Sequence, residues 1–273
     1  MSKHEIIVLE AGLPVKFDIY KSFNRLIPSH WHNHLEVLYI YQGTMQIVRN
    51  NKTYTITDND LFIVNSGDIH LTRSLGHVEV LCLLIPYELI TKSISEDKSI
   101  RFIEYFSHDE LYENSVFKSM LHQLIAMRTL YEQRPKGYQF LFISSLNLFL
   151  YILYNNYIVS QNIEIDKITK HLPRLKELLD YVEMNYSERI SLKDAASFVA
   201  LNPEYFCRTF KKFTGFTFME YVNLVRLAHI HKDILDTDDS ITAIQERHGF
   251  TNNKVFSRMF KEAYGCTPSK LRG

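Results

Sequence analysis

The sequence predicts an α+β protein with an N-terminal β-barrel of the jelly-roll type, a helical middle segment and an all-α C-terminal region. Short runs of β-branched and aromatic residues, separated by turn residues, fill the first part of the chain. A helical pattern of apolar residues follows, and one helical pattern near the C-terminus occurs twice. With 273 residues, 46% of them hydrophobic, the chain is long enough for two ordinary cores. We expect the three parts at residues 1–98, 99–165 and 166–273.

The barrel is predicted from five short runs with high β-propensity. Turn-forming residues separate these runs, as in small barrels and jelly rolls. The expected strands are residues 37–41, 45–48, 53–56, 61–64 and 78–85. The expected turns are Gln42-Gly43, Asn50-Asn51, Asp58-Asn59 and Ser66-Gly67-Asp68. The residues before the barrel, about 1–23, are expected to form an N-terminal arm.

The expected barrel contains a cluster of side chains that are common ligands. His30, His32 and Glu36 have the same parity and would project to one face of a strand. His70 follows a predicted turn and can join them. Three imidazoles and one carboxylate inside a barrel could bind a first-row transition metal or hydrogen-bond a small molecule. His34 has the same parity and is a possible substitute.

The spacing of this cluster resembles the two motifs of the cupin family. The run H-x-H-x3-E-x6-G is complete from His30 to Gly43, and Gly67 with His70 matches part of the second motif. The chain departs from the cupin pattern at Asn24, Asn59, Asn65 and Ser74. The resemblance implies a cupin-like barrel. Its polar cluster is interpreted as a metal-dependent isomerase or oxygenase site, as a small-molecule sensor site, or as histidines that merely cap strand ends.

The middle segment is predicted to be helical from about Ile100 to Tyr157. No Asp, Glu, Lys or Arg occurs from residue 137 to 163, a length that could span a bilayer of about 30 Å. Polar residues interrupt this segment, so a buried or subunit-facing helix is favoured over a membrane span. The interrupting residues are Gln139, Ser144, Ser145, Asn147, Asn155, Asn156, Gln161 and Asn162.

Two stretches near the C-terminus repeat one another 50 residues apart. The recurring residues are Phe206, Arg208, Phe210, Lys211 and Gly215, then Phe256, Arg258, Phe260, Lys261 and Gly265. In the first copy, Ser191 can cap one helix and Asn202-Pro203 can begin a second. In the second copy, Gly249-Phe250-Thr251 forms the turn. The repeat predicts two helix-turn-helix units, joined by one long helix at residues 218–235.

This repeat resembles the DNA-binding domain of the AraC/XylS family of transcription regulators over about residues 172–272. The matching residues are Gly249-Phe250, Phe256, Phe260-Lys261, Gly265, Pro268-Ser269 and Arg272. Gln245 and Leu271 depart from the family pattern, which has a small Ala and an aromatic residue there. The resemblance implies a regulator that binds double-stranded DNA, a small-molecule effector such as a sugar, and RNA polymerase. It also implies a homodimer, whose interface candidates are Leu146, Phe149, Leu150 and Leu153.

The exposed side of each second helix is predicted to face DNA. The major groove admits one α-helix and displays a distinct donor and acceptor pattern for each base pair. By resemblance, the base-reading positions are Glu204, Cys207, Arg208, Asn253, Lys254, Ser257 and Arg258. Lys211, Lys212 and Lys261 are expected to contact phosphates, and Pro203 lies on the same face. A solvated helix face is the alternative interpretation.

The charge distribution favours DNA binding by a local surface rather than by a whole domain. Residues 166–273 contain 17 Lys and Arg against 14 Asp and Glu, a net charge of +3, while residues 1–165 contain 14 against 17. Cys82, Cys207 and Cys266 lack metal or disulfide spacing, which favours a reducing cytosol. The first residues lack the apolar core of a secretory signal. The expected location is therefore the cytoplasm.

Together these observations predict a ligand-responsive transcription regulator that is not an enzyme and needs no cofactor. The effector is expected beside His30, His32, Glu36 and His70. A divalent metal ion held by the same four residues is the alternative. The alternative functions are a metal-dependent cupin enzyme with an accessory helical domain, and a constitutive regulator whose barrel is purely structural.

Overall fold

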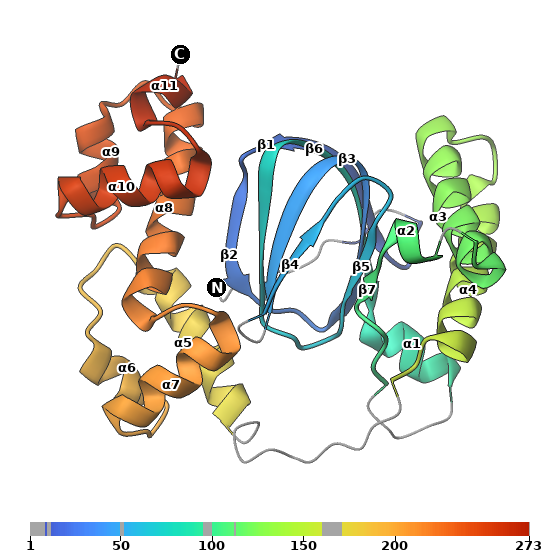
Figure 1. Ribbon diagram of the computed structural model, residues 1–273, viewed down its shortest axis with the longest axis horizontal. Helices are drawn as coiled ribbons and strands as arrows, with labels where there is room; N and C mark the ends of the chain where they lie inside the picture. The colour runs from blue at the N-terminus through green and yellow to red at the C-terminus, as the bar shows by residue number, and fades with distance from the viewer. Residues whose placement is uncertain are drawn as a thin grey trace.

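The computed structural model describes residue 9 and residues 12–49, 52–94, 100–111, 113–159 and 171–272. A β-barrel occupies the middle of the molecule in Figure 1. The C-terminal helices lie on one side of it, and helices α3 (Ser115–Gln133) and α4 (Tyr138–Asn156) lie on the other. The predicted α+β class, with a barrel, a helical segment and an all-α region in that order, is confirmed.

The seven described strands form one antiparallel sheet in which β6 and β3 are central. The order is β1-β6-β3-β5-β7, with β2 also paired to β6 and β4 to β3. The two central strands are 16 and 17 residues long, and register shifts in their pairing let the sheet curve into a barrel. The strands are β1 (Lys16–Phe23), β2 (Leu26–His30), β3 (His34–Arg49), β4 (Lys52–Ile56), β5 (Leu61–Val64), β6 (His70–Pro86) and β7 (Tyr105–Phe106).

The structure has one strand, β3, where the sequence predicts a turn between two. Gly43 has a φ of +98°, and a Cβ atom on it would lie 2.1 Å from the carbonyl oxygen of His77. This glycine therefore marks a bulge, at which β3 bends but stays paired with β6. The predicted turns at residues 58–59 and 66–67 are confirmed. The predicted turn at Asn50-Asn51 lies outside the described residues.

The expected N-terminal arm is wrong for residues 16–23, because these residues form β1. Strand β1 pairs with β6 from Lys16, opposite Leu84, to Phe23, opposite His77. Its sequence, KFDIYKSF, mixes charged and apolar residues, so its β-propensity is weak. Strand β2 is not predicted either, since it contains Pro28, and proline disfavours strands. Residues 1–8 lie outside the described part of the chain.

The four departures from the cupin pattern have physical explanations. Asn24 and Asn59 have φ values of 46° and 68°, a left-handed conformation that Asn tolerates better than most residues other than Gly. Buried Asn65 exchanges two hydrogen bonds with the backbone of Phe102, at 2.9 and 2.7 Å. Ser74 accepts a hydrogen bond of 2.7 Å from the amide of Arg25. Each substitution therefore keeps the barrel turns in place.

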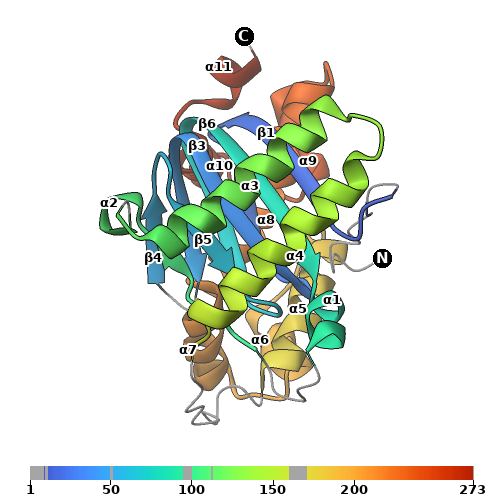
Figure 2. The same cartoon turned by 90° about the vertical axis from the view of Figure 1, so that its right-hand side faces the viewer.

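The predicted helical segment is confirmed and packs as a hairpin against the barrel, as Figure 2 shows. Asn114 caps α3 by accepting hydrogen bonds from the amides of Val116 and Phe117. Phe142 of α4 meets Phe17 of β1 edge to face, with ring centroids 5.1 Å apart. Short helices α1 (Tyr87–Ser93) and α2 (His108–Leu111) precede the hairpin. Neither α4 nor any other described helix combines the length and apolar character needed to cross a membrane.

Three of the four residues expected at a subunit interface lie inside the protomer instead. Leu146, Phe149 and Leu153 are at most 1% exposed and belong to the core shared by the hairpin and the barrel. Leu150 packs against the same core. The expectation is therefore wrong for Leu146, Phe149 and Leu153, while half-buried Leu150 stays a candidate. The large apolar residues that α4 exposes are Phe140, Leu141, Leu148 and Tyr151.

The predicted pair of helix-turn-helix units is confirmed. Ser191 and Asn202 cap α6 and α7 by accepting hydrogen bonds from the amides of Asp194 and Tyr205. Residues Gly215 and Gly265 end the second helix of each unit in the left-handed conformation. The helices are α5 (Leu172–Asn185), α6 (Leu192–Phe198), α7 (Pro203–Thr214), α8 (Phe218–Asp236), α9 (Ile241–Arg247), α10 (Asn253–Tyr264) and α11 (Pro268–Arg272).

Candidate DNA interface and effector cavity

Helices α7 and α10 are equivalent, each 12 residues long and offset by 50 positions. Each buries an apolar stripe, with Phe206 and Phe210 in α7 and Phe256 and Phe260 in α10. The opposite faces are exposed. They carry all of the residues predicted to contact DNA, which are Pro203, Glu204, Cys207, Arg208, Lys211, Lys212, Asn253, Lys254, Ser257, Arg258 and Lys261. Both faces are therefore accessible in this conformation.

Gln245, which replaces a small residue of the family pattern, fits inside the second unit. Its side chain is 5% exposed, and its amide nitrogen donates to the carbonyl oxygen of Phe250, at 2.9 Å, and to Oδ1 of Asn253. A buried amide with its hydrogen bonds satisfied costs little stability. Gln245 thus closes the turn and also fixes the side chain of Asn253, the first residue of α10.

The two units are joined by a packed contact as well as by α8. The Tyr186 ring stacks on His229, with centroids 4.1 Å apart, and the Tyr186 hydroxyl lies 3.1 Å from Nδ1 of His248. The other ring nitrogen of His248 lies 2.9 Å from the carboxylate of Asp233. Burial opposes ionisation of Asp233, but hydrogen bonds from His248 and Arg247 outweigh it and lower the pKa of the carboxyl. Sequence reasoning missed this contact, because its members come from three separate helices.

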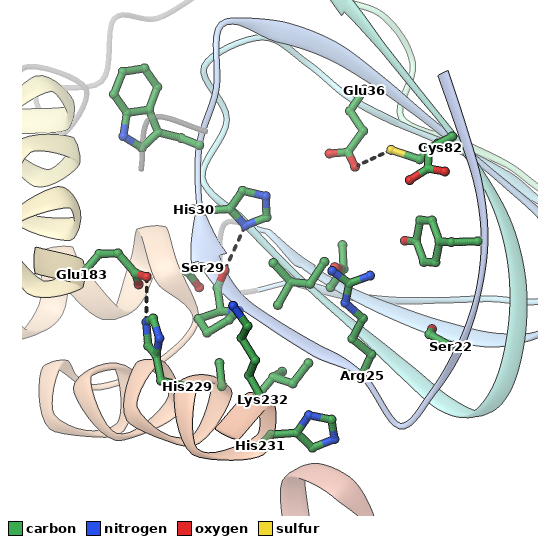
Figure 3. A pocket seen from close by; sticks show the side chains of 18 of the residues that line it. Ser22, Arg25, Ser29, His30, Glu36, Cys82, Glu183, His229, His231 and Lys232 are labelled. Carbon is green, nitrogen blue, oxygen red and sulfur yellow. Dashed lines mark hydrogen bonds and ion pairs between the residues drawn. The ribbon is translucent and has the colours of Figure 1, made fainter. Parts of the chain in front are cut away.

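A cavity of about 770 Å³ lies between the barrel and the C-terminal domain. Its wall is built from β1, β2, β3 and β6 on one side and from α5 and α8 on the other. Figure 3 shows Arg25 of the barrel and Lys232 of α8 extending into this space, with Glu36 and Cys82 at its inner end. A molecule in the cavity would therefore touch both domains. Arg25 and Lys232 were not predicted, because no motif marks them.

The predicted cluster of His30, His32, Glu36 and His70 is assembled in the barrel. One carboxylate oxygen of Glu36, Oε2, lies 3.1 Å from Nε2 of His32 and 3.0 Å from Nε2 of His70. The rings of His30 and His70 are 4.2 Å apart. His30 and Glu36 line the cavity, whereas His32 and His70 are not among its lining residues. The four residues do not share one strand. They converge because the chain bends between β2 and β3 and because His70, on β6, is paired with His30, on β2.

Each imidazole of the cluster is held by a backbone carbonyl. The Nδ1 atoms of His30, His32 and His70 lie 2.9, 3.2 and 3.1 Å from carbonyl oxygens. The carbonyls belong to Pro28, His34 and Asp68. These contacts fix the orientation of the three rings. One ring nitrogen from each of the three lies within 4.8 Å of the others, a geometry that could hold a metal ion. His34, the possible substitute, is not part of that group.

Burial and hydrogen bonding shift the pKa values of His30, Glu36 and His70 in different directions. Burial, reinforced by the neighbouring His70 and His32, lowers the pKa of His30 to about 3. Burial opposes ionisation of Glu36, but hydrogen bonds from His32 and His70 outweigh it and hold the pKa of its carboxyl well below the usual value. Burial likewise opposes a charge on His70, and its hydrogen bond to Glu36 outweighs this and raises the pKa of His70. The cluster therefore favours a negatively charged Glu36 next to a positively charged His70.

Trp31 and Ile69 connect this cluster to the C-terminal domain. Trp31 lies between His30 and His32 in sequence, and Ile69 precedes His70. Both belong to or pack against the core of the first helix-turn-helix unit. The ammonium group of Lys176, on α5, lies 4.1 Å from the Trp31 ring centroid. Residues 30–32 and 69–70 therefore contact both regions. Their histidines belong to the cluster, and Trp31 and Ile69 pack against the C-terminal domain.

The barrel rim, which comprises Asn24, Ser29 and Arg73, also forms hydrogen bonds with the C-terminal ends of α7 and α10. Asn24 donates to the carbonyl oxygen of Tyr264, at 2.6 Å, and Arg73 donates to that of Glu262. Ser29 donates to the carbonyl oxygen of Thr214 at 3.3 Å. These acceptors are among the last carbonyls of α7 and α10, which have no partner within the helix. The rim therefore holds the far ends of both helices while their exposed faces stay open.

Two regions of the chain match known sequence families. Residues 19–140 match the family described as AraC-like ligand binding domain. Residues 195–273 match the family described as Helix-turn-helix domain. The first region includes His30, His32, Glu36, His70 and all seven described strands except the first three residues of β1. The second includes α7 and α10 with all the residues predicted to contact DNA.

Known proteins that resemble this chain along most of its length are regulators. The HTH-type transcriptional activator RhaS of Pectobacterium carotovorum subsp. carotovorum (strain PC1) is 27% identical over 90% of this chain and 87% of that protein. The uncharacterized HTH-type transcriptional regulator YdeC of Bacillus subtilis (strain 168) is 24% identical over 98% of this chain and 93% of that protein. The solved structure of ToxT from Vibrio cholerae gives a TM-score of 0.49 at 13% identity, over 95% of this chain and 98% of that chain.

Proposed function

The chain belongs to the AraC family of transcription regulators, and we propose how its parts read DNA and respond to an effector. It combines a ligand-binding barrel with a DNA-binding domain and is a ligand-responsive regulator. The observation that supports the proposal most is the cavity between these two domains. Because α8 forms part of its wall, an effector there contacts the domain whose activity it must change.

The two recognition helices, α7 and α10, are proposed to enter successive major grooves, about 34 Å apart, on one face of DNA. Arg208 and Arg258 suit guanine edges, and Glu204 suits cytosine. Asn253 suits adenine, and its side chain is already held by Gln245. Lys254, Ser257 and Cys207 lie on the same reading faces. Lys211, Lys212 and Lys261 contact phosphates, and Pro203 approaches the backbone at the start of α7.

The test is fluorescence anisotropy with labelled DNA from upstream of the protein's own gene. Arg208→Ala and Arg258→Ala should each weaken specific binding by about 1–3 kcal/mol, which is roughly 5- to 150-fold. Lys136→Ala is the control, because it removes a positive charge between α3 and α4, on the far side of the barrel. Unchanged affinity in both arginine variants would contradict the assignment of the reading helices.

The effector is proposed to be a small polar metabolite, of which a sugar is one example. It occupies the cavity beside His30 and Glu36, with Arg25 and Lys232 as further hydrogen-bond donors. Binding shifts the population between arrangements in which the barrel holds the C-terminal domain differently. A bound effector must therefore raise the melting temperature and change DNA affinity together. An effector that stabilises the protein without altering DNA binding would favour a barrel with a purely structural role.

The barrel is proposed to sense rather than to catalyse. The relatives that match most of the chain are transcription regulators, and one is named an activator. We accordingly propose an activator that acts with RNA polymerase in the cytoplasm. The residue ranges 1–98, 99–165 and 166–273 remain the proposed division into sensor, helical segment and DNA-binding domain. Turnover of candidate substrates by the purified protein, without DNA binding, would favour the cupin-enzyme alternative.

A homodimer is proposed to form through the exposed face of α4. This face carries Phe140, Leu141, Leu148 and Tyr151, and Phe140 is 81% exposed. A contiguous group of large apolar residues on one helix is typical of an interaction surface. The helix lies on the opposite side of the barrel from the DNA-binding domain, so pairing there leaves α7 and α10 open (Figure 1).

A further inference from the structure

A buried position of the first helix distinguishes the two helix-turn-helix units. Gln245 of α9 and Ala196 of α6 are equivalent, because each lies five residues after the N-cap serine of its helix. The backbone oxygen of Gln245 accepts a hydrogen bond from the amide of Phe250 at 3.0 Å, and that of Ala196 accepts one from the amide of Leu201 at 2.9 Å. Both side chains are buried. The second unit therefore places a long polar side chain where the first unit has a methyl group.

The hydrogen bonds of Gln245 determine which way the amide of Asn253 points. A carbonyl oxygen can only accept, so the Gln245 atom that lies 2.9 Å from the carbonyl oxygen of Phe250 is its nitrogen, Nε2. The same nitrogen contacts the side chain of Asn253, and only Oδ1 of that side chain can accept from it. The nitrogen of the Asn253 amide, Nδ2, is thereby left to donate to another molecule.

The start of α10 does not need the Asn253 side chain as a cap. Asn252 caps the helix, and its Oδ1 accepts hydrogen bonds of 3.1 Å from the amides of Lys254 and Val255. Asn253 is exposed, whereas the side chain of Gln245 that holds it is buried. Asn253 is therefore held on a fixed backbone, from the interior of the unit, with its amide on the surface predicted to face DNA.

The oriented amide matches the major-groove edge of adenine. Oδ1 has two lone pairs, of which Gln245 occupies one, so Asn253 keeps one acceptor and both N–H donors of Nδ2. Adenine is read by a donor to its N7 and an acceptor for its N6 amino group. A freely rotating side chain must be ordered when DNA binds, which lowers affinity about 2- to 13-fold. Gln245 reduces that loss, because Asn253 is ordered before DNA arrives.

We propose that Gln245 is a positioning residue for base recognition, which holds Asn253 in the orientation that reads adenine. The first unit has Ala196 and Pro203 at the two equivalent positions, and the side chain of proline neither donates nor accepts. The second recognition helix therefore has a preset hydrogen-bonding group at its first residue, and the first recognition helix has none. This role of Gln245 rests on the proposed entry of α10 into a major groove.

The test compares base preferences, measured by fluorescence anisotropy with duplexes from upstream of the protein's own gene. Each base pair is substituted in turn, and Asn253→Ala identifies the pair that Asn253 reads by losing the preference there. Gln245→Ala should lower the preference at the same pair about 2- to 13-fold. Preferences at pairs sensitive to Arg258→Ala should stay within about 2-fold of wild type. Each preference is a ratio of two affinities of one variant, so a smaller folded fraction cannot mimic the loss.

A second variant, a double variant and a control separate positioning from packing. Gln245→Met fills the space of the glutamine without its donors and should lose the same preference. In the Asn253→Ala background, Gln245→Ala should cause no further loss, because Gln245 acts through Asn253. Gln133→Ala is the control, since Gln133 is an exposed glutamine at the end of α3, on the far side of the barrel. Wild-type preference in either Gln245 variant, or a further loss in the double variant, would overturn the positioning role.

A wrong assignment of the reading helix gives a different result. If Arg258→Ala and Asn253→Ala leave binding to every duplex unchanged, α10 does not read DNA, and the role of Gln245 is overturned with it. If both variants lose base preference while Gln245→Ala keeps it, α10 reads DNA and only the positioning role is overturned.

Discussion

Asn24 on the barrel rim donates its side-chain amide to the carbonyl oxygen of Tyr264, the last residue of the second recognition helix, at 2.6 Å. The same side chain accepts a hydrogen bond from the amide of Gly76 at 2.7 Å. Asn24 thus joins a turn of the barrel to the end of α10. This contact ties the sensor to the part of the protein that is proposed to read DNA.

Replacing Asn24 by Asp should loosen this joint while the barrel turn is kept. Asp still accepts from Gly76 and tolerates the left-handed backbone. It cannot donate to Tyr264, and its charge faces the negative end of α10, so we expect a loss of about 1–2 kcal/mol in domain docking. Scanning calorimetry should then show the barrel and C-terminal domain unfolding in more separate steps. Asn147→Asp, on the exposed side of α4, is the control, and identical traces for both variants would argue against the joint.

Gly249→Ala should destabilise the protein far more than Gly76→Ala. Both glycines have a φ near +70°, at 71° and 74°. A Cβ atom on Gly249 would lie 2.2 Å from the carbonyl oxygen of Ser187, whereas nothing lies within 4 Å of one on Gly76. We expect about 2–4 kcal/mol for Gly249→Ala and about 1–2 kcal/mol for Gly76→Ala. Urea unfolding measures both, and equal losses would mean that backbone conformation alone decides the cost.

The lysines and arginines of the recognition helices should differ in their salt dependence and specificity. Lys211→Ala or Lys261→Ala should weaken binding to all sequences alike and reduce the slope of log affinity against log salt by about 1. Arg258→Ala should instead relax the preference at one base pair. Titrations at several salt concentrations, with cognate and single-substituted DNA, separate the two effects. A lysine variant that changes base preference would reverse the assignment.

Asp233 should stabilise the joint between the two helix-turn-helix units only above acidic pH. Its pKa is lowered in the folded protein, so its contribution is fully present above its ordinary pKa of 3.8 and is lost as the pH falls through the lower folded value. Asp233→Asn should therefore cost about 1 kcal/mol at pH 7. The difference between variant and wild type should shrink progressively as the pH falls below 3.8 in chemical unfolding. A difference that stays constant as the pH falls below 3.8 would assign the loss to packing.

If the protein dimerises through the exposed face of α4, a charge placed on that face should weaken self-association. Phe140→Asp should weaken self-association at least 10-fold, because it places a charge within the apolar surface. Lys193→Glu, a charge change at an exposed position of α6 on the opposite side of the barrel, should leave self-association unaltered. Analytical ultracentrifugation over a range of protein concentrations measures both. If Phe140→Asp associated as tightly as wild type, the dimer interface would have to lie on another surface.

The C-terminal domain could be predicted from sequence nearly to the residue, because each copy of the repeat confirms the helix positions inferred from the other. The shared Phe, Arg and Gly positions fix which side of α7 and α10 is buried, and the caps at Ser191 and Asn202 mark where helices begin. What could not be predicted is the contact between the units. Tyr186, His229 and His248 meet only after three helices have packed, and no local pattern records that.

The barrel was harder to predict for two physical reasons. β1 is an amphipathic strand with charged residues, so its composition resembles an arm. The sequence around Gly43 predicts a turn, but in the structure this glycine lets β3 bend while it stays paired within the sheet. The convergence of the three histidines and Glu36 was predicted from their spacing. The physical reason differs from shared parity, because a bend between β2 and β3 and the pairing of His30 with His70 bring the side chains together. The alternation of His30, Trp31 and His32 did contain a signal for the outward contact of Trp31.

The hairpin of α3 and α4 and the DNA-binding domain lie on opposite sides of the barrel (Figure 1). Two chains joined back to back through α4 would hold their DNA-binding domains at the outermost ends of the assembly, with both barrels in between. Such a particle would span two well-separated half-sites, or would bend the intervening duplex, rather than cover one continuous stretch. Varying the spacing between half-sites by whole and half helical turns would therefore measure the architecture of the pair directly.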